Sequence, residues 1–520
     1  MSILMKDFAE TKGDEIALVD DNGSITWDDF DKRINSLVNG FRKSGLEQGD
    51  SVAIIAGNRI EWFETSFACA HAGLIYVPVN WHWVSDELAY VFEDSGCKAI
   101  MVGERFQEEV KKSLTDPRSN NISLVLQAGG ETVSNFVNYE DFLTSQSDEE
   151  PEDQLLGGPM FYTSGTTGRP KGVRSGLTEA GPGVTPDVMQ LVAAGFAAML
   201  PVPGVTALCG PVYHSAQWAF SWLPMIAGSS VVMQHKFDPA GLLSMMEKHK
   251  ATNVHLVPTQ FKRLLDLPDG EKEKFTGEFL QTVLHGAAPC PPKVKMQMIE
   301  WFGEKITEYY GATEGGIISL ISSQEWLERG GSLGKPLETI EAIVVDDSGK
   351  RCKSGEEGTL YFRNLMGTDF EYHNAPEKTE AAHLEPGVFT FGDIGFLDED
   401  GYLWLSDRKI DMIISGGVNI YPAEIEGVLG GHPDVKDVAV IGVPDEEFGE
   451  QVKAIVVPGE DHDDLESLAK QLVVYCRENL AGYKSPKSID FLEELPRTGT
   501  GKIQKQPLRE PYWKEEDRRI

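Results

Sequence analysis

A chain of 520 residues is too long to fold around one hydrophobic core, so we expect at least two domains. Its 82 acidic side chains outnumber its 47 basic ones, and the resulting formal charge of −35 repels nucleic acid and anionic lipid. The same charge repels every anionic ligand, so a site for one must be locally basic or carry a metal cation.

The six cysteines lie far apart in the sequence, and none stand at C-x-x-C spacing. This argues against a disulfide framework or a zinc site and favours a reducing compartment. The N-terminus lacks the apolar run of a signal peptide. The most apolar stretch, residues 188–200, is shorter than the roughly 20 residues that span a bilayer. We therefore expect a cytoplasmic protein with no membrane span.

Residues 1 to about 150 alternate helical and strand patterns. One helix is predicted by apolar residues at helical spacing, namely Phe30, Ile34, Leu37, Val38 and Phe41. Short apolar runs at 50–56, 75–80 and 98–103, with a helix at 62–73, predict parallel strands covered by helices. The fold class is therefore α/β. His71, Trp81, His82 and Trp83 fit structural roles better than catalytic ones.

An acidic connector at 145–153 leads into residues 162–173, which hold three glycines, Arg169, Lys171 and four Ser or Thr hydroxyls. Glycines let a backbone approach a ligand closely, and successive N–H groups with hydroxyls and a lysine bind anions. The stretch therefore favours a polyphosphate. The common P-loop spacing fails, because Pro170 and Gly172 occupy its second glycine and its Ser/Thr position. A solvated linker is the alternative.

This stretch resembles the signature loop of the adenylate-forming superfamily, which includes acyl-CoA synthetases, firefly-luciferase-like enzymes and peptide-synthetase adenylation domains. The resemblance implies a large N-terminal domain of several subdomains with layered sheets and helices, and a small, mobile α+β C-terminal domain. We place the boundary so that residues 1–408 hold the ATP and acyl sites. The implied ATP-binding residues of the loop are Thr163, Ser164, Gly165, Thr166, Thr167, Gly168 and Lys171.

Two further motifs follow in the family's order. Residues 210–218 resemble the Pro-aromatic-His motif of the acyl pocket, which implies a pocket role for His214 and an apolar wall for Trp218. A histidine packed in the core is the alternative there. Gly286, Ala287 and Ala288 follow a strand pattern and resemble the small-residue turn against which adenine lies, with an ordinary turn as the alternative.

The run from Tyr309 to Glu314 is the second strong signal. The resemblance implies that Tyr310 stacks on adenine, that Thr313 binds the α-phosphate and that Glu314 holds Mg²⁺. Tyr309 and Gly311 are implied at the nucleotide, and Gly311 also at the acyl pocket. Mg²⁺ prefers hard oxygen ligands, often one carboxylate completed by substrate phosphates, so the assignment is chemically reasonable.

The remaining motifs lie near and beyond the expected domain boundary. Asp393 matches the aspartate that accepts the ribose hydroxyls, and Arg408 matches an arginine at ribose and phosphate. Ile410 stands at the hinge position, where the family usually carries Asp or Lys. In residues 409–520, Gly416 and Gly417 are implied at the CoA channel. Lys502 lies in a glycine-flanked loop and matches the lysine that catalyses adenylation.

The resemblance implies an AMP-forming acyl-CoA synthetase that uses ATP, Mg²⁺ and CoA. Lys502, Glu314, Thr313 and His214 are its implied catalytic residues. The aromatic residues near His214 suggest an apolar pocket, and the Gly/Pro-rich segment 176–204 resembles relatives that activate bulky ring acids such as steroids or terpenoids. The resemblance therefore implies a bulky apolar or polycyclic acid, with a medium- or long-chain fatty acid as the alternative. An enzyme that loads a carrier protein, a luciferase-type oxygenase and a silent ATP-binding regulator are the competing interpretations. A homodimer stays open.

Overall fold

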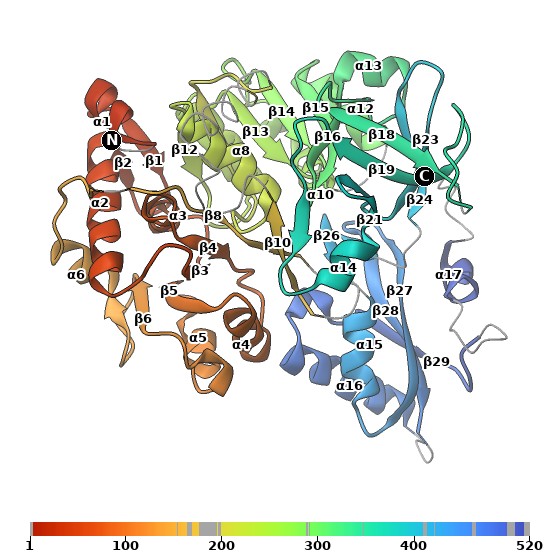
Figure 1. The fold of residues 1–520 in the computed structure, drawn as a ribbon. Helices are drawn as coiled ribbons and strands as arrows, with labels where there is room; N and C mark the ends of the chain where they lie inside the picture. Colours follow the sequence, from red (N-terminus) through yellow and green to blue (C-terminus); the bar gives the residue numbers. More distant parts are fainter. Residues whose placement is uncertain are drawn as a thin grey trace.

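The computed structural model describes residues 4–152, 154–163, 169–175, 195, 199–287, 290, 292–346, 348–408, 413–420, 422–459, 464–496 and 505–513. Figure 1 shows layered sheets and helices from red to teal, with the small C-terminal part in blue beneath the green and teal region. The predicted α/β fold is confirmed.

The first sheet has six strands in the order β7-β6-β5-β3-β4-β8, and all neighbours are parallel. Parallel neighbours need crossover connections, which helices supply here. The strands and helices predicted in this region are confirmed. The strands are β3 (Ser51–Ile55), β4 (Ile75–Pro78), β5 (Cys97–Gly103), β6 (Leu124–Ala128), β7 (Val137–Asn138) and β8 (Gly158–Pro159), and the helices are α3 (Ile60–Ala72), α4 (Ser85–Asp94), α5 (Gln107–Ser113) and α6 (Tyr139–Thr144).

Helix α2 (Trp27–Lys43) confirms the amphipathic pattern of the sequence. The Thr26 side chain accepts a hydrogen bond from the Asp29 N–H and so caps the first turn. The five apolar residues that predicted the helix are all buried. Together with residues of α3 and of strands from the two largest sheets, they form one apolar core. This core holds the six-stranded sheet against the nine-stranded sheet described next.

The second sheet has nine strands in the order β17-β16-β15-β14-β13-β11-β12-β1-β2. Its centre is parallel, while β2, β16 and β17 add antiparallel edges. Ligands of such sheets bind beyond the carboxyl ends of the strands. The strands are β1 (Ile16–Val19), β2 (Ser24–Thr26), β11 (Val205–Leu208), β12 (Ser230–Met233), β13 (Asn253–Leu256), β14 (Thr282–His285), β15 (Ile306–Ala312), β16 (Gly316–Ser322) and β17 (Lys335–Pro336).

The helices that accompany this sheet are α1 (Lys6–Lys12), α8 (Ser215–Ile226), α9 (Pro239–Lys248), α10 (Pro258–Leu265), α11 (Asp269–Lys272), α12 (Pro292–Phe302) and α13 (Ser323–Glu328). A second apolar core fills the space between α9, α10, α12 and the sheet. Within the part of the chain that the structure describes, none of the helices combines the length and apolar composition needed to cross a bilayer.

Two antiparallel sheets complete the large domain. The smaller one, β20-β10-β9, contains β9 (Phe161–Thr163), β10 (Lys171–Ser175) and β20 (Phe370–Tyr372). The larger one contains β18 (Ile340–Val345), β19 (Gly358–Asn364), β21 (His383–Glu385), β22 (Val388–Phe389), β23 (Asp393–Leu397) and β24 (Leu403–Arg408), with α14 (Pro376–Ala381) nearby. Strands β23 and β24 pair antiparallel as a hairpin.

The C-terminal part has its own five-stranded sheet and its own apolar core. The α+β class expected for it is confirmed, whereas the boundary at 408 and 409 stays a prediction. The elements are β25 (Ile413–Ser415), β26 (Val418–Ile420), α15 (Pro422–Gly430), β27 (Val435–Asp445), β28 (Gly449–Pro458), α16 (Leu465–Asn479), the 3₁₀ helix η2 (Gly482–Lys484), β29 (Ser488–Phe491) and α17 (Gln506–Trp513).

Candidate active site

The strands on either side of the glycine-rich loop bring its lysine to a carboxylate. β9 and β10 pair antiparallel, so that Thr163 lies opposite Lys171, and β10 also pairs with β20. The Tyr372 hydroxyl on β20 donates to Oε1 of Glu314 at 3.0 Å. Nζ of Lys171 lies 4.5 Å from the centroid of the Tyr372 ring. One aromatic side chain therefore connects the cation of the loop with the predicted metal ligand.

The charge on Glu314 is poorly solvated in this position. Burial raises the pKa of its carboxyl above the usual range, while the Tyr372 hydroxyl and Lys171 act in the opposite direction. Burial likewise lowers the pKa of Lys171. A cation bound at Glu314 would stabilise the carboxylate, because an opposite charge nearby favours the ionised form.

The candidate nucleotide residues converge from two sheets. The Tyr310 hydroxyl on β15 donates to Oδ2 of Asp393 on β23 at 2.6 Å. Arg408 lies opposite Asp393 in the β23–β24 ladder. The Tyr310 ring packs against Phe362 and Phe391, with centroids 5.9 and 6.0 Å away. The residues implied at adenine and ribose are therefore neighbours, although they are far apart in the sequence.

The acyl and phosphate motifs meet through two hydroxyls. Ser215 begins α8, and its Oγ lies 2.7 Å from Oγ1 of Thr313. His214 immediately precedes that helix, and burial, reinforced by His82, lowers its pKa to about 4. The imidazole is therefore neutral near pH 7. A neutral ring suits a pocket wall better than a site for a bound cation or a proton donor.

A buried polar chain lies behind this helix, and the sequence pattern did not reveal it. Nε2 of Gln217 lies 2.8 Å from Nδ1 of His255, and Nε2 of His255 lies 3.0 Å from the Tyr309 hydroxyl. The ring of Phe220 stacks on His255 at 5.1 Å. A Cβ on Gly286 would come within 2.6 Å of the Tyr309 ring, so only glycine leaves room for this tyrosine.

Three other predicted residues have clear structural settings. Trp218 donates from Nε1 to the Tyr76 hydroxyl at 2.9 Å and stacks on Trp222, so its ring is part of the core beneath α8. Its role as a pocket wall stays a prediction. A Cβ on Gly311 would lie 2.0 Å from the Gly316 carbonyl, and Ala287 adopts a φ of 66° in its turn. Gly311 therefore leaves no room for a side chain, and Ala287 has the left-handed backbone conformation that glycine adopts most readily.

The paired glycines of the small domain face the large domain. Gly416 and Gly417 form the β25–β26 turn with φ values of 59° and 77°, which glycine adopts readily. A Cβ on Gly417 would lie 3.5 Å from Cβ of Val257, directly after β13. The turn therefore lies beside the carboxyl end of a central strand. Outside the described residues lie Ser164, Gly165, Thr166, Thr167, Gly168, Ala288, Ile410 and Lys502, and for Arg408 only the backbone is described.

The donor set around Glu314 fits Mg²⁺ only when a ligand completes it. Among the residues that the structure describes, no three His, Cys, Asp or Glu side chains come together as a metal cage. Glu314 offers a carboxylate, and neighbouring Thr313 a hydroxyl, both of which are hard oxygen donors. Nucleotide phosphates would have to supply further ligands, as is common for Mg²⁺.

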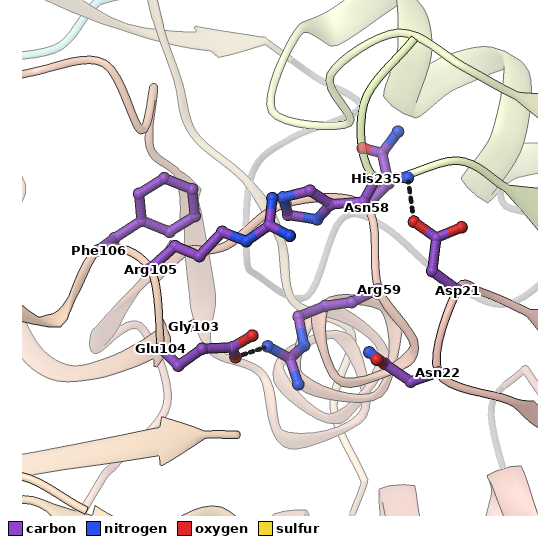
Figure 2. Close-up of a pocket in the computed structure, with 10 residues that line it drawn as sticks. Asp21, Asn22, Asn58, Arg59, Gly103, Glu104, Arg105, Phe106 and His235 are labelled. Atoms are coloured by element: carbon purple, nitrogen blue, oxygen red, sulfur yellow. Dashed lines mark hydrogen bonds and ion pairs between the residues drawn. The ribbon is translucent and has the colours of Figure 1, made fainter. Parts of the chain in front are cut away.

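A small cavity lies beside this site rather than within it. Figure 2 shows the guanidinium of Arg105 directed toward the ring of His235, while Arg59 pairs with Glu104. The cavity has a volume of about 50 Å³. Trp81 lies next to it and touches Tyr213 edge-on at 4.6 Å. The residues lining the cavity are Asp21, Asn22, Gly57, Asn58, Arg59, Gly103, Glu104, Arg105, Phe106 and His235, none of which belongs to a motif predicted from the sequence.

Comparison with known proteins agrees with this arrangement. The family described as AMP-binding enzyme matches residues 5–367, and its C-terminal domain matches residues 424–502. Feruloyl-CoA synthase from an Amycolatopsis species is 34% identical over 497 residues, which are 94% of this chain and 94% of the relative.

Two solved proteins give the structural comparison. Amide bond synthetase McbA from Marinactinospora thermotolerans has a TM-score of 0.85 at 26% identity, covering 98% of this chain and 100% of that one. For o-succinylbenzoate CoA synthetase from Bacillus subtilis, a double mutant with its product analogue OSB-NCoA has a TM-score of 0.82. The same enzyme in complex with its acyl-adenylate intermediate has a TM-score of 0.67. Both comparisons have 26% identity and cover 98% of each chain.

Proposed function

Since this chain belongs to the AMP-binding enzymes of the adenylate-forming superfamily, as an acid–thiol ligase, we propose that it works in two half-reactions at the site described above. A carboxylic acid and ATP give an acyl-adenylate and pyrophosphate, and the acyl group then passes to CoA. The observation that carries this proposal is the convergence of Lys171, Glu314, Tyr310 and Asp393.

In the first half-reaction a carboxylate oxygen attacks the α-phosphorus of ATP. The new oxygen–phosphorus bond forms as the bond to pyrophosphate breaks, and pyrophosphate leaves with the electron pair. Two anions must meet in a chain of charge −35, so local positive charge is the main requirement. Lys171 would hold the phosphates. Glu314 and Thr313 would hold Mg²⁺, which supplies charge neutralisation when bound.

Lys502 is proposed to bridge the carboxylate and the α-phosphate during this step. The support is its glycine-flanked motif near the C-terminus, within the match to the family's C-terminal domain. Tyr310 would orient the base, and Asp393 with Arg408 the ribose. Tyr310 and Asp393 are already hydrogen-bonded, which fixes their relative positions before a nucleotide arrives.

In the second half-reaction the CoA sulfur attacks the acyl carbon. The carbon–sulfur bond forms and the carbon–oxygen bond to AMP breaks, so that AMP leaves. Gly416 and Gly417 would border the channel for the thiol, and their turn lies beside Val257. The higher TM-score with the product-analogue complex than with the acyl-adenylate complex supports a small domain oriented for this second step.

For the acid we propose a bulky apolar or polycyclic skeleton, steroid- or terpenoid-like. Support comes from an apolar cluster in which Phe220 and Tyr309 join Leu200 and Leu284, with Ala216 packed against it. Feruloyl-CoA synthase, a relative, is named for an aromatic acid. A medium- or long-chain fatty acid is the second candidate. We also propose a reducing, cytoplasmic setting, which the six free cysteines support.

The test is a panel of aromatic, fatty, steroid and terpenoid acids with ATP, Mg²⁺ and CoA, read as thioester by mass spectrometry. Lys502→Ala should lower acid-dependent pyrophosphate release about 10²–10³-fold and largely spare thioester formation from supplied acyl-adenylate. Lys505→Ala, three residues away, is the matched control. AMP release with holo-carrier protein but not with CoA would favour a carrier-loading enzyme, and no acid-dependent pyrophosphate release at all would favour the silent binder.

A further inference from the structure

A buried lysine, Lys484, joins the two domains. Lys484 ends η2 in the small domain, and only 1% of its side chain is exposed. Its Nζ donates to Oε1 of Glu87 at 2.7 Å and to Oε1 of Glu424 at 2.5 Å. Glu87 lies on α4 of the large domain and Glu424 on α15 of the small domain. One cation therefore binds a carboxylate from each side of the interface.

The surroundings of Lys484 are built to receive it. Oε2 of Glu87 accepts a hydrogen bond from the Val84 N–H at 3.0 Å, which fixes this carboxylate at the start of α4. The neighbouring Tyr483 accepts a hydrogen bond from Nδ2 of Asn80 at 2.9 Å. Its ring meets His82 edge-on at 5.6 Å. Consecutive residues of η2 thus dock on the segment between β4 and α4.

The charges make this contact specific to one orientation of the domains. Burial raises the pKa of Glu424, Lys484 lowers it, and Glu87 raises it again. Without the lysine, two carboxylates would face each other away from water, which is costly. If the small domain turns away, Glu87 is exposed to water while Lys484 stays with Glu424. The three-membered arrangement is therefore complete only when the domains are docked.

The same docking positions the paired glycines. On another part of the interface, Arg263 on α10 pairs with Glu447 of the small domain at 2.6 Å. The Gly416–Gly417 turn reaches Val257, which lies between the end of β13 and the start of α10. The exposed pair contributes little, since surface ion pairs are largely screened. The buried bridge is the stronger candidate for holding this orientation.

We propose that Lys484 is a positioning residue for the second half-reaction, whose bridge to Glu87 holds the small domain where the Gly416–Gly417 turn faces the acyl site. The bridge forms in the thioester-forming orientation and must open before the small domain can turn for adenylate formation. This inference rests on the two-step function proposed above. Lys484 touches no reacting atom and acts through the orientation of the domain.

The first test compares Lys484→Met with Lys470→Met, a control at an exposed lysine of α16 that pairs with Glu466. Thioester formation from supplied acyl-adenylate and CoA should fall about tenfold or more in Lys484→Met, because the docked population shrinks. The rate of acid-dependent pyrophosphate release should stay unchanged or increase in Lys484→Met. Lys470→Met should change neither. Equal loss in both half-reactions, or no loss in thioester formation, overturns the proposal.

The second test reverses the charges across the interface and guards against simple misfolding. Glu87→Lys should impair thioester formation, because it opposes Lys484, and Glu87→Lys combined with Lys484→Glu should restore part of it. Failure of the double variant to exceed both single variants, when all are folded by circular dichroism, contradicts the bridge.

A distance measurement separates failure of the bridge from failure of the proposed function. Spin labels on α4 and α16 should give a narrow distance distribution in the unmodified chain and a broader one in Lys484→Met. If the panel yields no thioester, the function is wrong, and the distances alone decide on the bridge. An unchanged distribution in Lys484→Met refutes it, and a broadened one supports it.

Discussion

Replacing Glu314 by glutamine should stabilise the folded protein and remove its activity. The glutamine side chain keeps an oxygen that can accept from the Tyr372 hydroxyl, now 3.0 Å from Glu314, and differs only in charge. Burial already disfavours the charged carboxyl, as its raised pKa indicates. The Glu314 carboxylate, which the site needs to bind its cation, therefore destabilises the folded protein when no cation is bound.

The magnitudes follow from these contacts. Removing a desolvated charge while keeping its hydrogen bond should raise the free energy of unfolding by on the order of 1 kcal/mol. Loss of one electrostatic group at the reacting phosphate should cost about 10²–10³ in rate. Glu308 is the matched control, because it lies on β15, the strand that leads to Glu314, and pairs with fully buried Lys295. Glu308→Gln leaves that lysine unpaired and should destabilise by about 3–5 kcal/mol.

The assay combines urea unfolding with acid-dependent pyrophosphate release at saturating ATP. We expect Glu314→Gln to unfold at higher urea than the unmodified chain with almost no release, and Glu308→Gln to unfold at lower urea. If Glu314→Gln kept its rate, the carboxylate would have no place in the chemistry. If it were less stable than the unmodified chain, the electrostatic account of the site would be wrong.

Three further predictions concern pH and single contacts. Because the pKa of Glu314 is raised, the KM for MgATP should rise as pH falls through it, and Glu314→Gln should abolish that dependence; equal pH profiles would count against it. Burial lowers the pKa of His71 to about 4, whereas the same side chain in the unfolded chain binds a proton below about pH 6.5. The free energy of unfolding should therefore be about 2 kcal/mol lower at pH 5 than at pH 8. His71→Leu should remove this loss, measured as Tm at pH 8 and pH 5, and an undiminished drop would contradict the assignment. Tyr310→Phe loses the 2.6 Å hydrogen bond to Asp393 and should raise the KM for ATP roughly tenfold, whereas an unchanged KM would show that the bond does not orient the site.

Local patterns in the sequence predicted much of the fold. The helix through Phe30 and Phe41 and the strands at 51–55 and 97–103 follow from apolar spacing alone. The motifs also predicted that Tyr310, Asp393 and Glu314 belong to one site, and the structure places Tyr310 on Asp393. That grouping came from the resemblance of these motifs to the adenylate-forming superfamily.

Contacts between distant segments could not be predicted in the same way. Tyr372 reaches Glu314 because β20 pairs with β10, and no pattern around Tyr372 indicates that pairing. The partners Lys484 and Glu87 stand 397 residues apart. Strand order and domain docking decide such contacts, and both depend on the packing of the whole chain. His255 carried a weak signal, as a polar residue within an apolar strand.

The central claim is that this site joins a carboxylic acid to CoA at the expense of ATP. Its most direct test is to supply the panel acids, ATP, Mg²⁺ and CoA to the purified protein and to identify both products by mass spectrometry. We expect AMP and an acyl-CoA thioester in equal amounts, both dependent on the acid. Release of ADP, or formation of AMP at the same rate with and without the acid, would contradict the account.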